Sequence, residues 1–187
     1  MNVTRTLYVT DRKKWRSWLR KHHRIAKDVW LVYFRKETGK PRIAYEDAVE
    51  EALCFGWIDS TVKKLDEKRF AQRFSPRRPG RPYSQTNKER LRRLIRQKKV
   101  IKSVLATLGD LSGETFTIPP DILKPLKANK AAWTNFRKFP PEYQRIRIGY
   151  IDHAKNRPEE FRKRLRNFLA KTEKNEQFGF GIARFYY

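Results

Sequence analysis

The fold is decided around one short apolar run, Val29-Trp30-Leu31-Val32-Tyr33-Phe34. All six residues are β-branched, aliphatic or aromatic, and the run is too short for a helix. It is ended by Thr38-Gly39-Lys40-Pro41, a stretch with the composition of a turn. A continuous apolar run of this length, bounded by a turn, predicts a buried strand.

Amphipathic helices are expected on both sides of this strand. Before it, apolar positions from Trp15 to His22 keep helical spacing behind Asp11, which is a suitable N-cap. After it, a second periodic stretch begins at Tyr45 and ends before Gly56, where a helix terminus favours a residue with positive φ.

Two extended stretches come next, residues 57–62 and 69–74, and they are predicted to form a hairpin. Side chains alternate between the two faces of a strand. The second arm should therefore place Phe70 and Phe74 on one face and Arg73 on the other.

The pattern becomes helical from residue 119 to about residue 171, after a less regular connection. We therefore expect an α+β fold, with a small mixed sheet and flanking helices followed by a helical C-terminal subdomain. The expected boundaries are an α+β domain over residues 1–100, a linker over 101–118 and the helical subdomain over 119–187. The aromatic residues 185–187 are expected to pack back on the fold or to meet another chain.

Positive charge is concentrated in residues 68–102, which carry 14 Lys/Arg and a single acidic residue, Glu89. A proline-rich loop over 75–83 leads into a helix capped by Ser84 or Thr86, with Glu89 three residues after Thr86 as in a capping box. The net charge of the whole chain is +25. A ligand of this segment is expected to be anionic.

Composition excludes several classes of protein. A single cysteine, Cys54, cannot form an internal disulfide, and three histidines beside it offer no four-ligand zinc spacing. We expect no metal and no cofactor. The N-terminus lacks the apolar region of a signal peptide, and the longest apolar run is far shorter than a membrane span, so a cytoplasmic location is expected.

The stretch Glu51-Ala52-Leu53-Cys54-Phe55-Gly56-Trp57-Ile58-Asp59-Ser60, together with Asp66, Phe74-Ser75-Pro76-Arg77-Arg78 and Ser84-Gln85-Thr86-Asn87-Lys88, resembles the YdeI/OmpD-associated family, also called bacteriocin-protection proteins. Residues 118–131, Phe136 and Ile151-Asp152-His153-Ala154-Lys155 are similar to the C-terminal helical part of that family. Lys98 departs from the family pattern, in which a glycine commonly follows the basic helix.

This resemblance implies an intracellular bacterial protein of mixed α and β structure, linked to protection against bacteriocins and cationic antimicrobial peptides. It brings no established set of catalytic residues. Membership of the family would therefore leave the mechanism to be argued from the residues themselves.

The residues predict a site in which an acidic side chain orients nearby cations, and the cations keep donors for the carboxylate or phosphate of a ligand. The amides at the start of the basic helix would add to it. The predicted members of this anion site are Trp57, Asp59, Arg73, Arg77, Arg78, Ser84, Asn87 and Lys88. The alternative interpretation is structural: Asp59 makes an ion pair or a cap, Trp57 is core, and the basic run is a solvated face.

The leading hypothesis is a non-enzymatic protection or stress factor that binds an anionic small molecule or a protein partner. A second hypothesis is a nonspecific nucleic-acid-binding module that contacts phosphates through Arg90, Arg92, Arg93 and Arg96. An enzyme with Asp59 as general acid or base is third, because no activated nucleophile, metal set or phosphate-binding glycine loop accompanies it. The oligomeric state is open.

Overall fold

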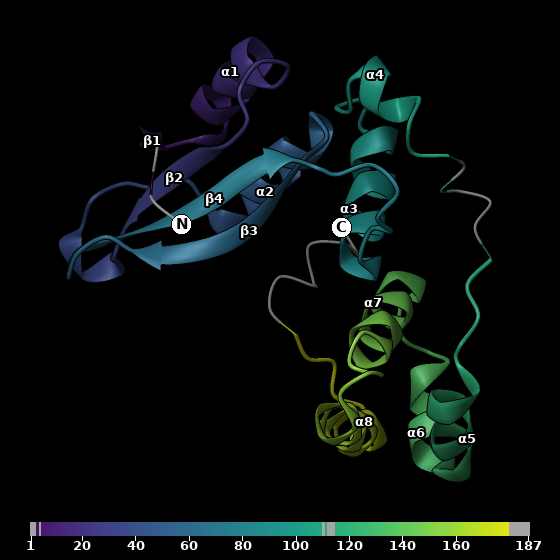
Figure 1. Ribbon diagram of the computed structural model, residues 1–187. Helices are drawn as coiled ribbons and strands as arrows, with labels where there is room; N and C mark the ends of the chain where they lie inside the picture. Colours follow the sequence, from purple (N-terminus) through teal and green to yellow (C-terminus); the bar gives the residue numbers. More distant parts are fainter. Residues whose placement is uncertain (1–2, 4, 110, 112–114, 180–187) are drawn as a thin grey trace. The chain divides into compact units, whose positions relative to one another are not determined.

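The computed structural model describes residues 3, 5–109, 111 and 115–179, and the chain divides into two compact units (Figure 1). The first unit comprises Met1–Arg81 and Leu94–Gly109, and the second comprises Pro82–Arg93 and Asp110–Tyr187. Residues 82–93 thus group with the C-terminal helices, while the expected domain boundaries at residues 100 and 119 stay a prediction. Each unit is described by itself.

The first unit contains a four-stranded mixed sheet with the strand order β1-β2-β4-β3. Strand β1 is parallel to β2, and the other two pairings are antiparallel. The expected α+β class and the buried strand are confirmed. The strands are β1 (Thr6–Leu7), β2 (Val29–Phe34), β3 (Trp57–Lys64) and β4 (Arg69–Pro76).

The register of β2 against β4 decides which side chains share a face. Leu31 lies opposite Gln72, and Tyr33 lies opposite Phe70. These residues therefore lie on one face of the sheet. Arg73 lies on the other face, where its Nε and Nη2 donate to Asp28 Oδ2 at 2.9 and 2.6 Å. The predicted alternation along the second hairpin arm is confirmed.

Helices α1 (Arg12–His22) and α2 (Tyr45–Cys54) cover part of the face that carries Phe74. The Trp15 ring meets the Phe74 ring edge-on at 5.4 Å, and Trp15 Nε1 donates to the Ala48 carbonyl at 2.9 Å. Asp11 caps α1 by accepting from the Lys14 amide, as expected. A 3-10 turn, η1 (Lys36–Thr38), lies between β2 and α2.

Ion pairs between arginines of α1 and buried glutamates of α2 connect the two helices. Glu50 and Glu51 are 1% and 3% exposed. Arg12 donates to both of them, at 3.0 Å to Glu50 and 2.7 Å to Glu51, and Arg16 donates to Glu51 at 2.6 Å. A second nitrogen of Arg16 donates to the Lys99 carbonyl at 2.8 Å. Both glutamates therefore have cationic partners, which offset the cost of removing their charges from water.

Helix α3 (Gln85–Arg96) ends in a left-handed residue. Lys98 has φ +55°, and its amide donates to the Ile95 carbonyl at 2.8 Å, while the Lys99 amide donates to the Leu94 carbonyl at 3.0 Å. This pattern is a Schellman motif, whose left-handed position is usually a glycine. Helix α4 (Lys102–Leu105) follows.

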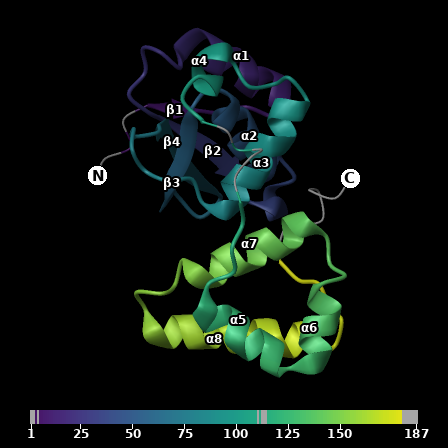
Figure 2. The same cartoon turned by 90° about the vertical axis from the view of Figure 1, so that its right-hand side faces the viewer.

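The second unit is helical, as expected, and Figure 2 shows its four C-terminal helices. They are α5 (Pro120–Ala128), α6 (Lys130–Phe136), α7 (Pro141–Asp152) and α8 (Pro158–Glu173). Their shared core includes Leu126, Phe136, Tyr143 and Phe168, all nearly inaccessible to solvent. Phe178 packs against this core and donates its amide to Tyr143 Oη at 3.3 Å. The aromatic residues 185–187 lie outside the described residues.

Within the second unit, α3 and α7 approach closely at Gly149. A Cβ added at Gly149 would lie 2.5 Å from Gln85 Cβ and 3.2 Å from Gln85 Cγ. Real Cβ atoms do not come this close to another carbon, so only glycine fits without movement of one helix.

We expect Gly149→Ala to lower the free energy of unfolding by about 1–3 kcal/mol, because overpacking forces the helices apart. The measurement is urea unfolding. The double variant Gln85→Gly/Gly149→Ala should recover most of the loss. If the contact were loose, Gly149→Ala would instead stabilise the protein by about 1 kcal/mol through helix propensity.

Candidate functional site

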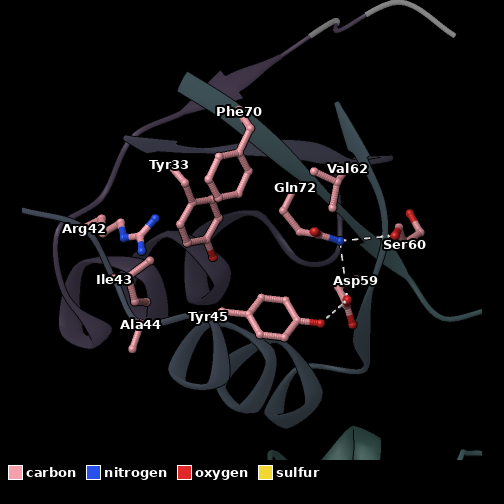
Figure 3. A pocket seen from close by; sticks show the side chains of 10 residues that line it. All are labelled: Tyr33, Arg42, Ile43, Ala44, Tyr45, Asp59, Ser60, Val62, Phe70 and Gln72. Atoms are coloured by element: carbon pink, nitrogen blue, oxygen red, sulfur yellow. Dashed lines mark hydrogen bonds between the residues drawn. The ribbon is translucent and has the colours of Figure 1, made fainter. Parts of the chain in front are cut away.

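A pocket of about 650 Å³ opens at one end of the sheet face that α1 and α2 cover only in part (Figure 3). Its wall comes from β2, β3 and β4, and from the segment that leads into α2. Every lining residue belongs to the first unit. They are Tyr33, Arg42, Ile43, Ala44, Tyr45, Asp59, Ser60, Val62, Phe70 and Gln72.

The carboxylate of Asp59 has two neutral hydrogen-bond donors, and both use the same oxygen. Tyr45 Oη donates to Asp59 Oδ2 at 2.7 Å, and Gln72 Nε2 donates to it at 3.4 Å and to the Ser60 carbonyl at 3.2 Å. In the described part of the chain, Oδ1 accepts from no residue. One carboxylate oxygen therefore remains available to a ligand.

The hydroxyl of Tyr33 is a buried polar group at the pocket. The residue is 2% exposed, its ring stacks on Phe70 at 5.2 Å, and its Oη has no hydrogen-bond partner among the described residues. Burial, and then the nearby Tyr45 and Asp59, raise the pKa of Tyr33, so the phenol stays protonated. A buried hydroxyl without a partner is costly, and a bound ligand is one way in which that cost is removed.

Arg42 supplies the positive charge of the pocket. Its Nη1 donates to the Phe34 carbonyl at 2.9 Å, which fixes the guanidinium at the end of β2. Arg42 lowers the pKa of Tyr33 in opposition to Asp59, so both charges act on the same hydroxyl. The guanidinium has five N–H donors, and this single bond leaves others for a ligand.

Of the predicted site residues, Asp59 alone lines this pocket. Trp57 is 1% exposed and belongs to the core, where its Nε1 donates to the His23 carbonyl at 3.1 Å. Arg73 lies on the opposite sheet face, bound to Asp28. Arg77 and Arg78 follow the end of β4, and the Arg77 amide donates to the Gly56 carbonyl at 2.9 Å. The carboxylate of Asp59 and these arginines therefore do not share the pocket.

The other predicted members belong to the second unit. Ser84 caps α3, because its Oγ accepts from the Asn87 amide at 3.3 Å. Asn87 is buried, and its Oδ1 accepts from Arg90 Nη1 at 2.7 Å. Lys88 is half-buried on the first turn of the helix. Ser84 and Asn87 therefore have structural roles at the start of α3.

The basic helix α3 is not a uniformly solvated face. Glu89 is 2% exposed and binds Arg92 and Arg145, with Arg145 Nε at 2.7 Å and Nη2 at 2.9 Å. Arg92 also donates to the Leu111 carbonyl at 2.8 Å. The expected capping-box role of Glu89 is wrong, because α3 begins at Gln85 behind the cap Ser84, so Asn87 rather than Glu89 stands three residues after the cap. Arg90 and Arg93 are half-buried, and Arg96 is exposed.

Sequence reasoning missed Tyr33, Arg42, Tyr45 and Gln72. One signal was present: Gln72 alternates with Phe70 and Phe74, and a polar side chain on an otherwise apolar strand face needs a polar partner. Its partner is Asp59. The other lining residues are brought together only by strand pairing.

The described residues hold neither an activated thiol nor a cluster of metal ligands. Burial raises the pKa of the Cys54 thiol to about 11, so it is protonated at neutral pH and a poor nucleophile. In the described ranges, His, Cys, Asp and Glu form no cluster of three or more that could hold a metal ion. No helix in those ranges combines the length and apolarity needed to cross a bilayer.

We expect Tyr33→Phe to leave the free energy of unfolding unchanged or to raise it by up to about 1 kcal/mol, because it removes a buried hydroxyl that has no partner. The matched control is Tyr45→Phe, which loses a 2.7 Å bond to Asp59 and should cost about 0.5–1 kcal/mol. Thermal and urea unfolding measure both. A clear loss of stability in Tyr33→Phe would show that this hydroxyl has a partner.

Two family models match this chain, one over its N-terminal half and one over its C-terminal helices. Residues 7–107 match the model of a domain of unknown function (DUF8412), which covers more than half of the chain. Residues 115–175 match the model described as Bacteriocin-protection, YdeI or OmpD-Associated. No curated protein and no solved structure gives a significant match. The chain therefore belongs to the DUF8412 family through its N-terminal half, and its C-terminal helices carry the YdeI/OmpD-associated family match that its sequence suggests.

Proposed function

We propose that this protein is a non-enzymatic ligand-binding protein whose site is the pocket around Tyr33, and that its ligand carries an anionic group bound by Arg42. The observation that carries the proposal is the buried Tyr33 hydroxyl, which has no hydrogen-bond partner among the described residues. A ligand that accepts from or donates to this oxygen would remove the cost of its burial.

The anionic group of the ligand follows from Arg42. Its guanidinium keeps donors beyond the one used by Phe34, and it lines a pocket of about 650 Å³. Hydrogen bonds from a cation to a carboxylate or phosphate are about twice as strong as neutral ones. Our proposal therefore centres the anion site on Arg42, which was not among the residues that the sequence predicted for it.

A protective role is the biological part of the proposal. It is supported by the family description matched by residues 115–175, which names bacteriocin protection. A binding domain could serve protection by holding a small molecule or a partner segment. Such a role requires no catalytic group, which fits the protonated Cys54 and the neutral hydrogen-bond partners of Asp59.

The test is a thermal-shift screen of a metabolite library, followed by calorimetry on the hits. We expect hits that contain an acid group, and Arg42→Gln should weaken them about tenfold to a hundredfold, through loss of a charge-assisted hydrogen bond. Arg42→Lys keeps the charge and should lose less.

The matched control is Arg78→Gln, which removes an exposed guanidinium outside the pocket and should leave affinity unchanged. Equal weakening by both variants, or hits that are indifferent to Arg42, would contradict the proposal. Circular dichroism verifies that Arg42→Gln is folded, since this variant also loses the bond to Phe34.

A second candidate function is nonspecific binding to nucleic acid, and a specific observation favours a surface other than α3. Exposed cations line the outer side of α1 and the turn after it: Lys13, Arg20, Lys21, Arg24 and Lys27. Cations on a helix face that is free of exposed acids can contact successive phosphates.

We expect this binding to fall steeply with salt, with a slope of log K against log salt near −4 for about five phosphate contacts. The triple variant Arg20→Gln/Lys21→Gln/Arg24→Gln should reduce both the affinity and the slope. A matched triple on α8, Arg162→Gln/Lys163→Gln/Arg166→Gln, removes three exposed cations elsewhere. Equal losses in both triples would mean that binding reflects net charge alone. Filter binding to generic DNA and RNA measures these effects.

A further inference from the structure

We infer that the ligand of the Tyr33 pocket is amphoteric, with an acid group for Arg42, an ammonium or similar N–H donor for Asp59, and an apolar body between them. A free amino acid or a short peptide with an apolar side chain has this chemistry. The inference deepens the proposed function and rests on it, but it fixes a ligand class that the proposed function leaves open.

The first step is the unmatched charge of Asp59. Its carboxylate is half-buried, and its hydrogen-bond donors are the neutral groups of Tyr45 and Gln72. Neutral donors orient a carboxylate without compensating its charge, and both of them use Oδ2. A cationic donor at Oδ1 would add the missing charge and fill the open acceptor position.

The second step is the placement of the two charges. Figure 3 shows the Tyr33 hydroxyl between Arg42 on one side and Asp59 on the other. The two charged groups shift the pKa of Tyr33 in opposite directions, which requires both to lie near its hydroxyl. A ligand seated at this hydroxyl therefore meets a positive charge at one end and a negative charge at the other.

This placement disfavours ligands with a single charge. A simple anion at Arg42 would enter the same pocket as the Asp59 carboxylate and would be repelled by it. A simple cation at Asp59 would meet Arg42 in the same way. A ligand that carries both charges satisfies both ends at once and gains from each.

The third step is the apolar part of the wall. Phe70 stacks on Tyr33, and Val62 is 58% exposed. Ile43 and Ala44 line the pocket near Arg42 (Figure 3). An exposed valine beside an aromatic ring offers apolar surface that a ligand can cover. The volume of about 650 Å³ falls within the range of pockets for small organic ligands.

The experiment uses one dipeptide, phenylalanyl-leucine, in four forms: free, with an amidated C-terminus, with an acetylated N-terminus, and with both ends blocked. Isothermal calorimetry on the full chain gives each affinity. We expect the free form to bind best, and each single block to weaken binding at least about tenfold, the loss of one charge-assisted contact.

Variants assign each end of the dipeptide to its residue. In Asp59→Asn, acetylation should no longer weaken binding, while amidation still does. In Arg42→Gln, the reverse is expected. Glu67→Gln and Arg78→Gln are matched controls that each remove an exposed charge outside the pocket, and both should behave as the unaltered protein. Because the comparison is made within each variant, a general loss of affinity does not mimic the result.

The inference is overturned if the doubly blocked form binds as well as the free form, or if no form binds at millimolar concentration. It is also overturned if blocking either end has the same effect in Asp59→Asn as in the unaltered protein. In each of these cases, library hits that depend on Tyr33 and Arg42 would leave the proposed function standing. Absence of any hit that depends on these residues would remove both.

Discussion

The antiparallel pairing of β2 with β4 is the constraint from which the rest of the first unit follows. It sets Tyr33 beside Phe70 and Leu31 beside Gln72. Strand β3 pairs with the other side of β4, where Asp59 lies opposite Phe74 and accepts a hydrogen bond from Gln72. Side chains change face at every residue, so a slip of one position would move the buried Tyr33 and Gln72 to the other side of the sheet. The core and the pocket therefore depend on one register.

Several acidic residues form ion pairs with arginines of their own unit. Glu50, Glu51 and Glu89 are buried with arginine partners, and Asp28 holds Arg73. A buried acid stripped of its cation would be strongly destabilising, so these pairs constrain the packing of helices. Arg12, Arg16, Arg92 and Arg145 are therefore partners of buried acids rather than members of a solvated basic face.

The local features of this fold were predictable, and the long-range ones were not. The continuous apolar run predicted the strand at 29–34, and helical spacing behind the cap Asp11 predicted the first helix. Both patterns act over a few positions of the sequence. The partner of Glu89 is Arg145, 56 positions along the chain, and no local pattern reports such a pairing. The local pattern around Glu89 suggested a capping box instead, because it contains no sign of this distant arginine. The pocket joins β2, the segment before α2 and the hairpin, so its composition depends on tertiary structure.

The left-handed turn at Lys98 connects the end of the basic helix to the packing of the first helix. The residue after it, Lys99, presents the carbonyl that receives Arg16, and Arg16 in turn holds the buried Glu51. A lysine in this backbone conformation is about 1 kcal/mol less favourable than a glycine. The chain therefore places a weak point directly beside a buried charge, and local opening of this turn would remove one of the bonds that position Arg16. Fraying at a helix end and loosening of an ion pair on a distant helix would then be one event rather than two.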